Sequence, residues 1–448
     1  MSILPSASSR PWLRWCLVGL LLLLGVNLFV NRALINAERV NTDMDRTDQG
    51  AYINYAEWMV KDPNFVGPRN RMPAFPYILS KFRDLEETDE AFFEKAKIIS
   101  ITITVIVVAL LGVVFFLTFS LHTAINLTFL CAFFVFLFRA AYVQAEVLYF
   151  FLSFLAFFSL WKLFTRPSSL WALAGGVLLG LAHLTKASVL PGVLTFGVFY
   201  VADALWRAVR SRQWKPAVHR LAVATVVIVA FVATIYPYIK NSKEIYGHYF
   251  YNVNSTFYIW CDSWEEAKDR TRAFGDRVGW PNVPAEQLPS ASNYFRTHTP
   301  EQILKRITTG AYDLNGIMIR SYGYYPMLWI YVGFLVALVV WRWRLCWRVF
   351  SHRPMPILAL VALFTGYYIL GGWYTQIISG NRIILSLFLP FIFTLAAATT
   401  TLGGKRILSL GSLRVNGLLL LNITISIYLL IDIYLLSTIR ILRFYGGS

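Results

Sequence analysis

Apolar runs recur along nearly the whole chain and constrain its fold more than any other feature. Each run has roughly 20 residues, enough to cross a hydrocarbon core about 30 Å thick. Because lipid offers no hydrogen bonds, a spanning backbone must satisfy its polar groups internally, which predicts helices rather than open strands. With 57% hydrophobic and 15% charged residues, the chain is too apolar for a soluble fold. The sequence therefore predicts an all-α polytopic membrane protein.

We predict about eleven membrane spans from these runs. They cover residues 12–31, 97–118, 122–139, 146–163, 169–185, 187–205, 219–237, 326–343, 355–372, 383–401 and 415–436. The first span follows Arg10 and Arg14 and lacks a clear small-residue cleavage site, so we interpret it as an anchor rather than a signal peptide. Residues 1–448 are expected to form one membrane-embedded domain without a soluble C-terminal domain.

Basic residues in the short loops predict the orientation. Segments such as WRAVRSRQWKPAVHR and WRWRLCWRVFSHRP fall on the same side as Arg10 and Arg14, which the positive-inside rule assigns to the cytoplasm. The net charge of +17 therefore mostly reflects topology, and these clusters can also meet anionic membrane lipids. Nucleic acid is not an expected partner, because the basic residues are scattered over membrane-flanking loops.

Two segments are too long to be simple connectors, and both are predicted to lie outside. They cover about residues 32–96 and 238–325, and long non-spanning segments in compact proteins are usually functional. The outer side also collects most of the acidic residues, so chemistry is expected there. Within the second segment, the pattern from Pro300 to Tyr312 predicts an amphipathic helix lying on the membrane.

The cysteine and histidine residues do not indicate a cofactor. Their spacing matches no metal-ligand pattern, and no phosphate-binding or dinucleotide-binding glycine motif is present. We therefore expect no metal or other cofactor, although a divalent metal is compatible with a site that contains carboxylates.

The stretch TDQGAYINYAEWM carries the strongest catalytic signal. If it is helical, Asp48, Tyr52 and Ala56 share one face, and the carboxylate lies near the membrane surface. A carboxylate fixed there suits proton abstraction or cation binding, and the alternative is that Asp48 only caps the following helix. Asp43 and Asp45 are rival candidates for the same role, with solvation as their alternative.

Three further charged residues, Glu146, Lys186 and Arg382, lie at the outer edges of separate spans. An ionisable side chain at the centre of a membrane helix costs roughly 2.5–3.5 kcal/mol. The presence of each of these three residues near the membrane therefore requires an explanation. Snorkelling to the interface is the simple explanation for each residue alone. Their common depth and side instead favour a shared site with Asp48.

Several motifs together resemble the GT-C glycosyltransferases of the dolichyl-phosphate-mannose–protein mannosyltransferase and aminoarabinose transferase type. TDQGAYINYA is similar to their first outer-loop motif, and GLAHLTKAS matches a Gly-Leu-Ala-x-Leu-Thr-Lys signature. RNRMPAFPYILS, YPYIKNSKEIYGHYF and SGNRIILSLFLP resemble further family segments, in the family's order. The resemblance covers most of residues 12–400. Two departures are Gln49, where many members have a second acid, and Lys240, which replaces an arginine.

This resemblance implies a GT-C-like bundle that moves a sugar, with inversion, from a polyprenyl-phosphate donor to a lipid, glycan or protein acceptor. It also implies a multi-pass enzyme of the bacterial inner membrane whose active site faces outside. We assign Asp48 as the general base, and the cations Lys186, Arg382 and Arg71 as phosphate-binding groups.

The remaining candidate residues are Tyr52, Tyr55 and Glu146. The two tyrosines are expected to line the cavity or position the sugar, with helix packing as the alternative. Glu146 is expected to contact the substrate or orient a lysine, and a structural pair with Arg139 is its alternative. A membrane transporter or lipid flippase with an outer-leaflet phosphate site is the main alternative function, although paired repeats typical of transporters are not visible.

Overall fold

The fold is described from a computed structural model of the chain. The structure describes residues 11–62, 65, 67, 70–269, 289–319, 326–377, 381–403, 407–410 and 413–435. These residues are almost entirely helical, as the sequence predicts. One short antiparallel hairpin is the exception; its strands are β1 (Ile407–Leu410) and β2 (Leu413–Asn416).

The first half of the chain supplies helices that run from the N-terminal anchor to the start of the second long loop. They are α1 (Pro11–Arg39), α2 (Gln49–Lys61), α3 (Ala74–Ser80), α4 (Asp89–Thr118), α5 (Leu121–Cys131), the π-helix η1 (Ala132–Phe136), α6 (Leu137–Ala140), α7 (Glu146–Thr165), α8 (Ser169–Thr185), the 3₁₀ turn η2 (Ala187–Val189), α9 (Leu190–Ser211) and α10 (Lys215–Tyr246).

The second half begins with short helices and then returns to long apolar ones. They are α11 (Val253–Thr256), the 3₁₀ turn η3 (Tyr258–Trp260), α12 (Trp264–Ala267), α13 (Ala291–Thr297), α14 (Pro300–Met318), α15 (Pro326–Trp341), α16 (Trp343–His352), α17 (Pro354–Tyr374), α18 (Asn381–Ser386), α19 (Phe388–Gly403) and α20 (Gly417–Leu435).

Eight of the described helical segments are long and apolar enough to cross a membrane. A ninth span results if the bent pair α15 and α16 is taken as one span. The predicted spans at 169–185 and 383–401 correspond to shorter apolar helices, Ser169–Thr185 and Phe388–Gly403. The chain is therefore a multi-pass membrane protein, while the predicted count of about eleven spans is not confirmed.

The helices α7, α8 and α10 pack closely because small residues lie between them. A Cβ atom at Gly176 of α8 would clash with the carbonyl oxygen of Val227 on α10. Such close approach is how helices associate in lipid, where apolar surface alone gives little driving force. This packing fixes α7 and the end of α8, which both carry site residues.

The loops are shorter than the sequence predicts, because the helices continue beyond the apolar runs. Helix α1 extends to Arg39, α4 begins at Asp89 and α10 extends to Tyr246. The predicted amphipathic helix is present as α14, and it packs on α17 through the close approach of Gly310 to Gly372. That α14 lies on the membrane stays a prediction.

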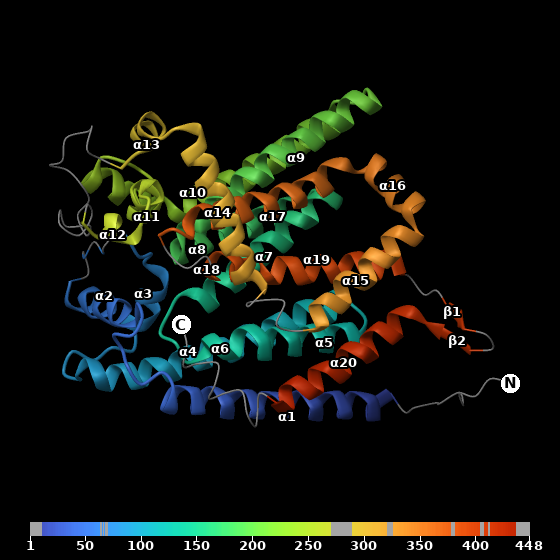
Figure 1. The fold of residues 1–448 in the computed structure, drawn as a ribbon, viewed down its shortest axis with the longest axis horizontal. Helices are drawn as coiled ribbons and strands as arrows, with labels where there is room; N and C mark the ends of the chain where they lie inside the picture. Colours follow the sequence, from blue (N-terminus) through green and yellow to red (C-terminus); the bar gives the residue numbers. More distant parts are fainter. Residues whose placement is uncertain are drawn as a thin grey trace.

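The short helices gather at one end of the bundle. Figure 1 shows α2, α3, α11, α12 and α13 at this end, which we call the loop end, while α16 and the β-hairpin lie at the opposite end. The two predicted outer segments thus meet at the loop end, where their residues can form one site.

Candidate functional site

Asp48 lies at the loop end between two arginine side chains. Its Oδ1 accepts a hydrogen bond from Nη2 of Arg71 at 2.9 Å, and its Oδ2 accepts one from Nη1 of Arg382 at 2.7 Å. Arg71 precedes α3, whereas Arg382 lies in α18, more than 300 residues away in sequence. The carboxylate therefore joins the first long loop to a late helix.

Glu146, the first residue of α7, extends this group of charges. Its Oε1 is 3.3 Å from Nζ of Lys186 and 3.4 Å from Nε of Arg382. Arg382 thus contacts both carboxylates. We call Asp48, Arg71, Glu146, Lys186 and Arg382 the charged cluster. The structure brings these predicted site residues together from distant parts of the chain, although their roles stay predictions.

Gln49 explains why Asp48 lies beside Glu146. The Gln49 side chain is fully buried, exchanges two hydrogen bonds of 2.8 Å with Asn41, and accepts a third from the backbone N–H of Val143 at 2.9 Å. Because Val143 lies three residues before the first residue of α7, this amide fixes the start of α2 against the segment that leads into α7. At the position where many GT-C members have a second acid, this chain has a structural amide.

The alternative roles considered for Asp48, Asp43 and Asp45 fit the structure less well. Asp48 is the N-cap residue of α2, but its side chain makes no capping hydrogen bond and instead contacts the two arginines. The rivals Asp43 and Asp45 are exposed, and Asp43 Oδ1 accepts a hydrogen bond from the backbone N–H of Asp45. Glu146 forms ion pairs with Lys186 and Arg382, and the positive charge of Arg139 also acts on its carboxylate, so the pair with Arg139 stays an alternative.

The second long loop holds the segment around Arg71. Asn254 Nδ2 donates a hydrogen bond to the carbonyl oxygen of Asn70 at 3.1 Å, and Tyr238 Oη donates one to Met72 Sδ at 3.3 Å. Tyr374 in turn donates to the carbonyl oxygen of Asn254 at 3.0 Å. Sequence reasoning missed these asparagine contacts, because a lone asparagine in a long loop carries no distinguishing pattern.

The charged cluster is partly open to solvent. The side chains of Asp48, Arg382 and Lys186 are 36%, 32% and 30% exposed, whereas Glu146 is only 3% exposed. Burial raises the pKa of Asp48, but the guanidinium groups of Arg382 and Arg71 outweigh it and lower the pKa below its ordinary value of 3.8. In this arrangement Asp48 is a charged but weakly basic carboxylate.

The two predicted tyrosines lie in different surroundings. Tyr52 is almost buried, packs edge-to-face on Phe75 at 5.6 Å between ring centroids, and lies 5.8 Å from the Arg71 guanidinium. Tyr55 packs on Phe65 and against Gly67, where a Cβ atom would overlap its ring. The Tyr52 ring thus packs beside the Arg71 guanidinium, while the described contacts give Tyr55 a packing role. Sugar binding by either tyrosine stays a prediction.

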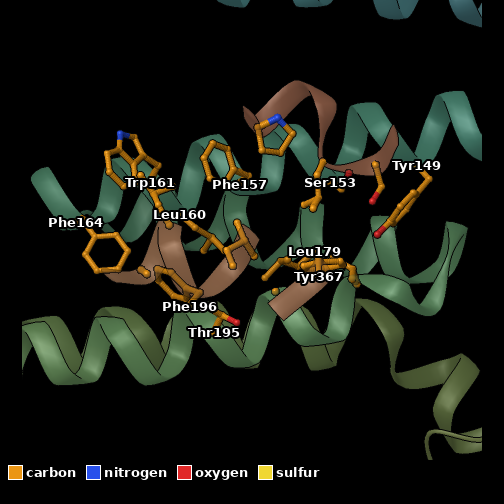
Figure 2. A pocket seen from close by; sticks show the side chains of 18 residues that line it. Tyr149, Ser153, Phe157, Leu160, Trp161, Phe164, Leu179, Thr195, Phe196 and Tyr367 are labelled. Atoms are coloured by element: carbon orange, nitrogen blue, oxygen red, sulfur yellow. The ribbon is translucent and has the colours of Figure 1, made fainter. Parts of the chain in front are cut away.

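An apolar cavity begins one turn from the charged cluster, and its empty space, including the part open to the surroundings, is about 720 Å³. Its lining includes Tyr149, Val189 and Ser386, which follow Glu146, Lys186 and Arg382 by three or four residues. Figure 2 shows Tyr149 at one end and Phe164 at the other. These residues are fifteen positions apart on α7, which corresponds to roughly 22 Å. The cavity therefore extends deep into the bundle.

Two further features bear on ligand binding. His183, one turn before Lys186, is buried among the rings of Phe231, Tyr238 and Phe250, so it packs in the core. In the described part of the chain no group of three His, Cys, Asp or Glu residues is arranged to hold a metal ion. Asp48 and Glu146 are the carboxylates of the cluster, and both contact arginine.

A comparison with protein families gives one match. The family model for dolichyl-phosphate-mannose-protein mannosyltransferase matches residues 81–243, just over a third of the chain. This stretch contains Glu146 and Lys186, whereas Asp48, Arg71 and Arg382 lie outside it. The resemblance to this family is confirmed over these residues, and it supports a membrane glycosyltransferase. No curated protein and no solved structure matches the chain.

Proposed function

We propose that this membrane protein, similar to the mannosyltransferase family over residues 81–243, is an inverting glycosyltransferase that uses a polyprenyl-phosphate sugar. The observation that carries the proposal is the proximity of the charged cluster to the apolar cavity, whose lining includes residues within one helical turn of Glu146, Lys186 and Arg382. A lipid-linked sugar donor has the same two parts, an anionic phosphate and a long apolar tail. The cations Arg382, Lys186 and Arg71 suit the phosphate, and the cavity suits the tail.

The donor phosphate must compete with carboxylates for these cations. In the structure Arg382 contacts both Asp48 and Glu146, Arg71 contacts Asp48, and Lys186 contacts Glu146. A phosphate that binds Arg382 and Arg71 takes them from Asp48. Loss of these positive partners, together with the new negative charge, raises the pKa of Asp48. Donor binding therefore converts a weakly basic carboxylate into a useful general base.

The transfer step follows from this arrangement. The acceptor hydroxyl or amine attacks the anomeric carbon, and its proton moves to an oxygen of Asp48. The bond between the anomeric carbon and the phosphate oxygen breaks, and its electron pair leaves with the polyprenyl phosphate. The cations stabilise this added negative charge, an effect that typically supplies several kcal/mol. One displacement inverts the anomeric centre, and one carboxylate suffices as base.

Glu146 is proposed to contact the sugar. Its Oε2 is buried and has no hydrogen-bond partner among the described residues, while its Oε1 pairs with Lys186 and Arg382. A buried hydrogen-bond acceptor without a partner lowers stability, so a hydrogen bond from a hydroxyl group of the donor sugar would stabilise Oε2. Because three side-chain cations serve the phosphate, the mechanism needs no metal, and turnover is expected to survive chelation by EDTA.

The site is proposed to face the outside of a bacterial inner membrane. The loop end contains both predicted outer segments, and the α16 end contains the basic WRWRLCWRVFSHRP segment. The acceptor is a lipid, glycan or protein that reaches this face. Labelling of a cysteine introduced at the exposed Asp45 by a membrane-impermeant reagent on intact cells tests this orientation, and labelling only after lysis would contradict it.

The function is tested by a transfer assay with the purified chain in lipid nanodiscs. The donor is radiolabelled polyprenyl-phosphate mannose, and membrane extract supplies acceptors. We expect transfer by the unchanged protein and a loss of roughly 10²–10⁴-fold in Asp48→Asn, as for removal of a general base. Asp45→Asn is the matched control, because it changes an exposed acid three residues away and should keep its activity.

Two outcomes would overturn the proposal. Normal transfer by Asp48→Asn with an inactive Asp45→Asn would move the base to a rival residue. Movement of an intact labelled donor across a vesicle membrane, with no cleavage of the sugar–phosphate bond under any acceptor condition, would instead identify a transporter or flippase.

A further inference from the structure

Helix α16 turns sharply away from α15. The axes of Met327–Trp341 and Trp343–His352 differ by 88°. Arg342 lies at the bend, and its side chain donates a hydrogen bond to the carbonyl oxygen of Leu402 at the end of α19. Because α15 is apolar along its whole length, we interpret it as the membrane-crossing part of this bent pair. A helix perpendicular to it would then lie close to the membrane plane.

The surface of α16 is uncovered and divided into two faces. No residue of this helix is buried, and Trp343 and Trp347 are 60% and 64% exposed. These two tryptophans are one turn apart, so they share a face, whereas Arg344 and Arg348 share the neighbouring face. Exposed tryptophan beside arginine is typical of a helix lying in the interface of a membrane.

The positive charge around α16 indicates which kind of partner this helix can bind. Arginine is present at 342, 344, 348 and 353, and the sequence has no acidic residue from Met327 to Tyr374. Arg210 of α9 donates a hydrogen bond to the carbonyl oxygen of Ser351, which brings further basic residues close to α16. A symmetric contact with a second copy would place like charges opposite each other. A negatively charged surface is the complementary partner.

We infer that α16 lies in the head-group region of the leaflet opposite the charged cluster and binds anionic lipid. Figure 1 shows α16 at the end of the bundle opposite the loop end. Trp343 and Trp347 enter the boundary with the acyl chains, and Arg344 and Arg348 bind lipid phosphate groups. This binding surface is separate from the proposed transfer site and does not depend on glycosyl transfer.

The orientation of α16 is tested by spin labels at two adjacent positions. Trp347→Cys and Arg348→Cys are made in protein with Cys16 and Cys346 replaced by serine, and are labelled in nanodiscs that contain phosphatidylglycerol. We expect greater collision of the label at 347 with oxygen, which concentrates in lipid, and of the label at 348 with a water-soluble nickel complex. Two water-exposed labels, or two labels shielded from both reagents, would overturn the inference; shielding would indicate a protein partner.

The preference for anionic lipid is tested separately. Protein is equilibrated in equimolar phosphatidylcholine and phosphatidylglycerol vesicles, solubilised and purified, and its retained lipid is quantified. Arg344→Gln with Arg348→Gln should reduce the enrichment of phosphatidylglycerol, by about fivefold for each arginine. Arg212→Gln with Lys215→Gln is the matched control, because these two exposed residues lie outside α16, Arg212 just after α9 and Lys215 at the start of α10. Equal enrichment in both double variants would contradict anionic lipid binding by α16.

Discussion

Two carboxylates in this protein each contact two arginine side chains, one at either end of the bundle, and their surroundings differ. Asp48 lies 2.9 and 2.7 Å from Arg71 and Arg382. Asp203 of α9 lies 2.8 and 2.9 Å from Arg207 and Arg220. The chemistry and the distances are almost the same. Ion pairing alone therefore does not distinguish a functional carboxylate from a structural one.

The exposure of the two groups does distinguish them. Asp203 and Arg220 have side chains that are 1% and 8% exposed, and Arg220 also donates to the carbonyl oxygen of Phe164. Asp48 and Arg382 are 36% and 32% exposed, and a cavity begins within one turn of Arg382. A closed ion pair holds helices together, whereas an open one can exchange its partner for a ligand.

The largest expected effect is on stability at the closed pair. Asp203→Asn leaves the buried Arg220 without its counter-charge and should lower the free energy of unfolding by about 3–5 kcal/mol. The same substitution at Asp48 should cost about 1 kcal/mol or less, because its ion pairs are partly exposed. Thermal melts of both purified variants in one detergent measure the difference. Equal losses of stability in the two variants would show that exposure does not separate a structural carboxylate from a functional one.

The next effect concerns donor binding by the open cluster. Lys186→Gln or Arg382→Gln removes a charge-assisted contact worth roughly 1.5–3 kcal/mol, so the affinity for a polyprenyl-phosphate sugar should fall about ten- to a hundredfold. Arg207→Gln is the control, since Arg207 is 37% exposed and pairs with the closed carboxylate. A binding titration of the solubilised variants is required. Unchanged donor affinity in both variants would indicate that Lys186 and Arg382 only anchor their helices at the membrane interface.

A smaller effect is expected in the pH dependence of turnover. In the free enzyme the pKa of Asp48 is lowered, so Asp48 stays ionised throughout the neutral and mildly acidic range. With the donor bound, its pKa rises because the phosphate takes the arginines. The acidic limb of kcat, which reports the complex, should therefore lie at higher pH than that of kcat/KM, which reports the free enzyme. Coincident limbs would show that Asp48 keeps its arginine partners during turnover.

The smallest effect concerns the contact between the two long loops. Asn254→Ala removes the hydrogen bond to the carbonyl oxygen of Asn70, next to Arg71. Loss of one neutral hydrogen bond, about 0.5–1.5 kcal/mol, should weaken donor binding about two- to tenfold and leave the melting temperature nearly unchanged. Ser255→Ala is the neighbouring control. If both variants bind the donor normally, the second loop does not position Arg71.

The sequence predicted the charged cluster better than it predicted the structures around it. Asp48, Glu146, Lys186 and Arg382 could be grouped because ionisable residues are rare in apolar spans, and topology places these four on one side. Arg71 was found through the resemblance of its motif. That Arg382 joins two carboxylates depends on tertiary packing, which residue spacing does not determine.

Other features had no usable signal in one sequence. Gln49 was noted only as a missing acid, yet its amide fixes α2 against the segment before α7. Asp203 and Arg220 are seventeen residues apart on adjacent helices, and nothing in their spacing distinguishes them from ordinary loop-edge charges. The bend between α15 and α16 contains neither proline nor glycine, so a predicted span at 326–343 gave no indication that helix continues to His352.

The central claim, that Asp48 and the donor phosphate compete for the same arginines, is tested most directly by donor binding to Asp48→Asn. Removal of the competing charge frees Arg71 and Arg382, so this variant should bind a polyprenyl-phosphate sugar several-fold to tenfold more tightly while its turnover is lost. The titration is run beside the unchanged protein in the same nanodiscs. Weaker donor binding, or equal binding with unchanged turnover, would contradict the account.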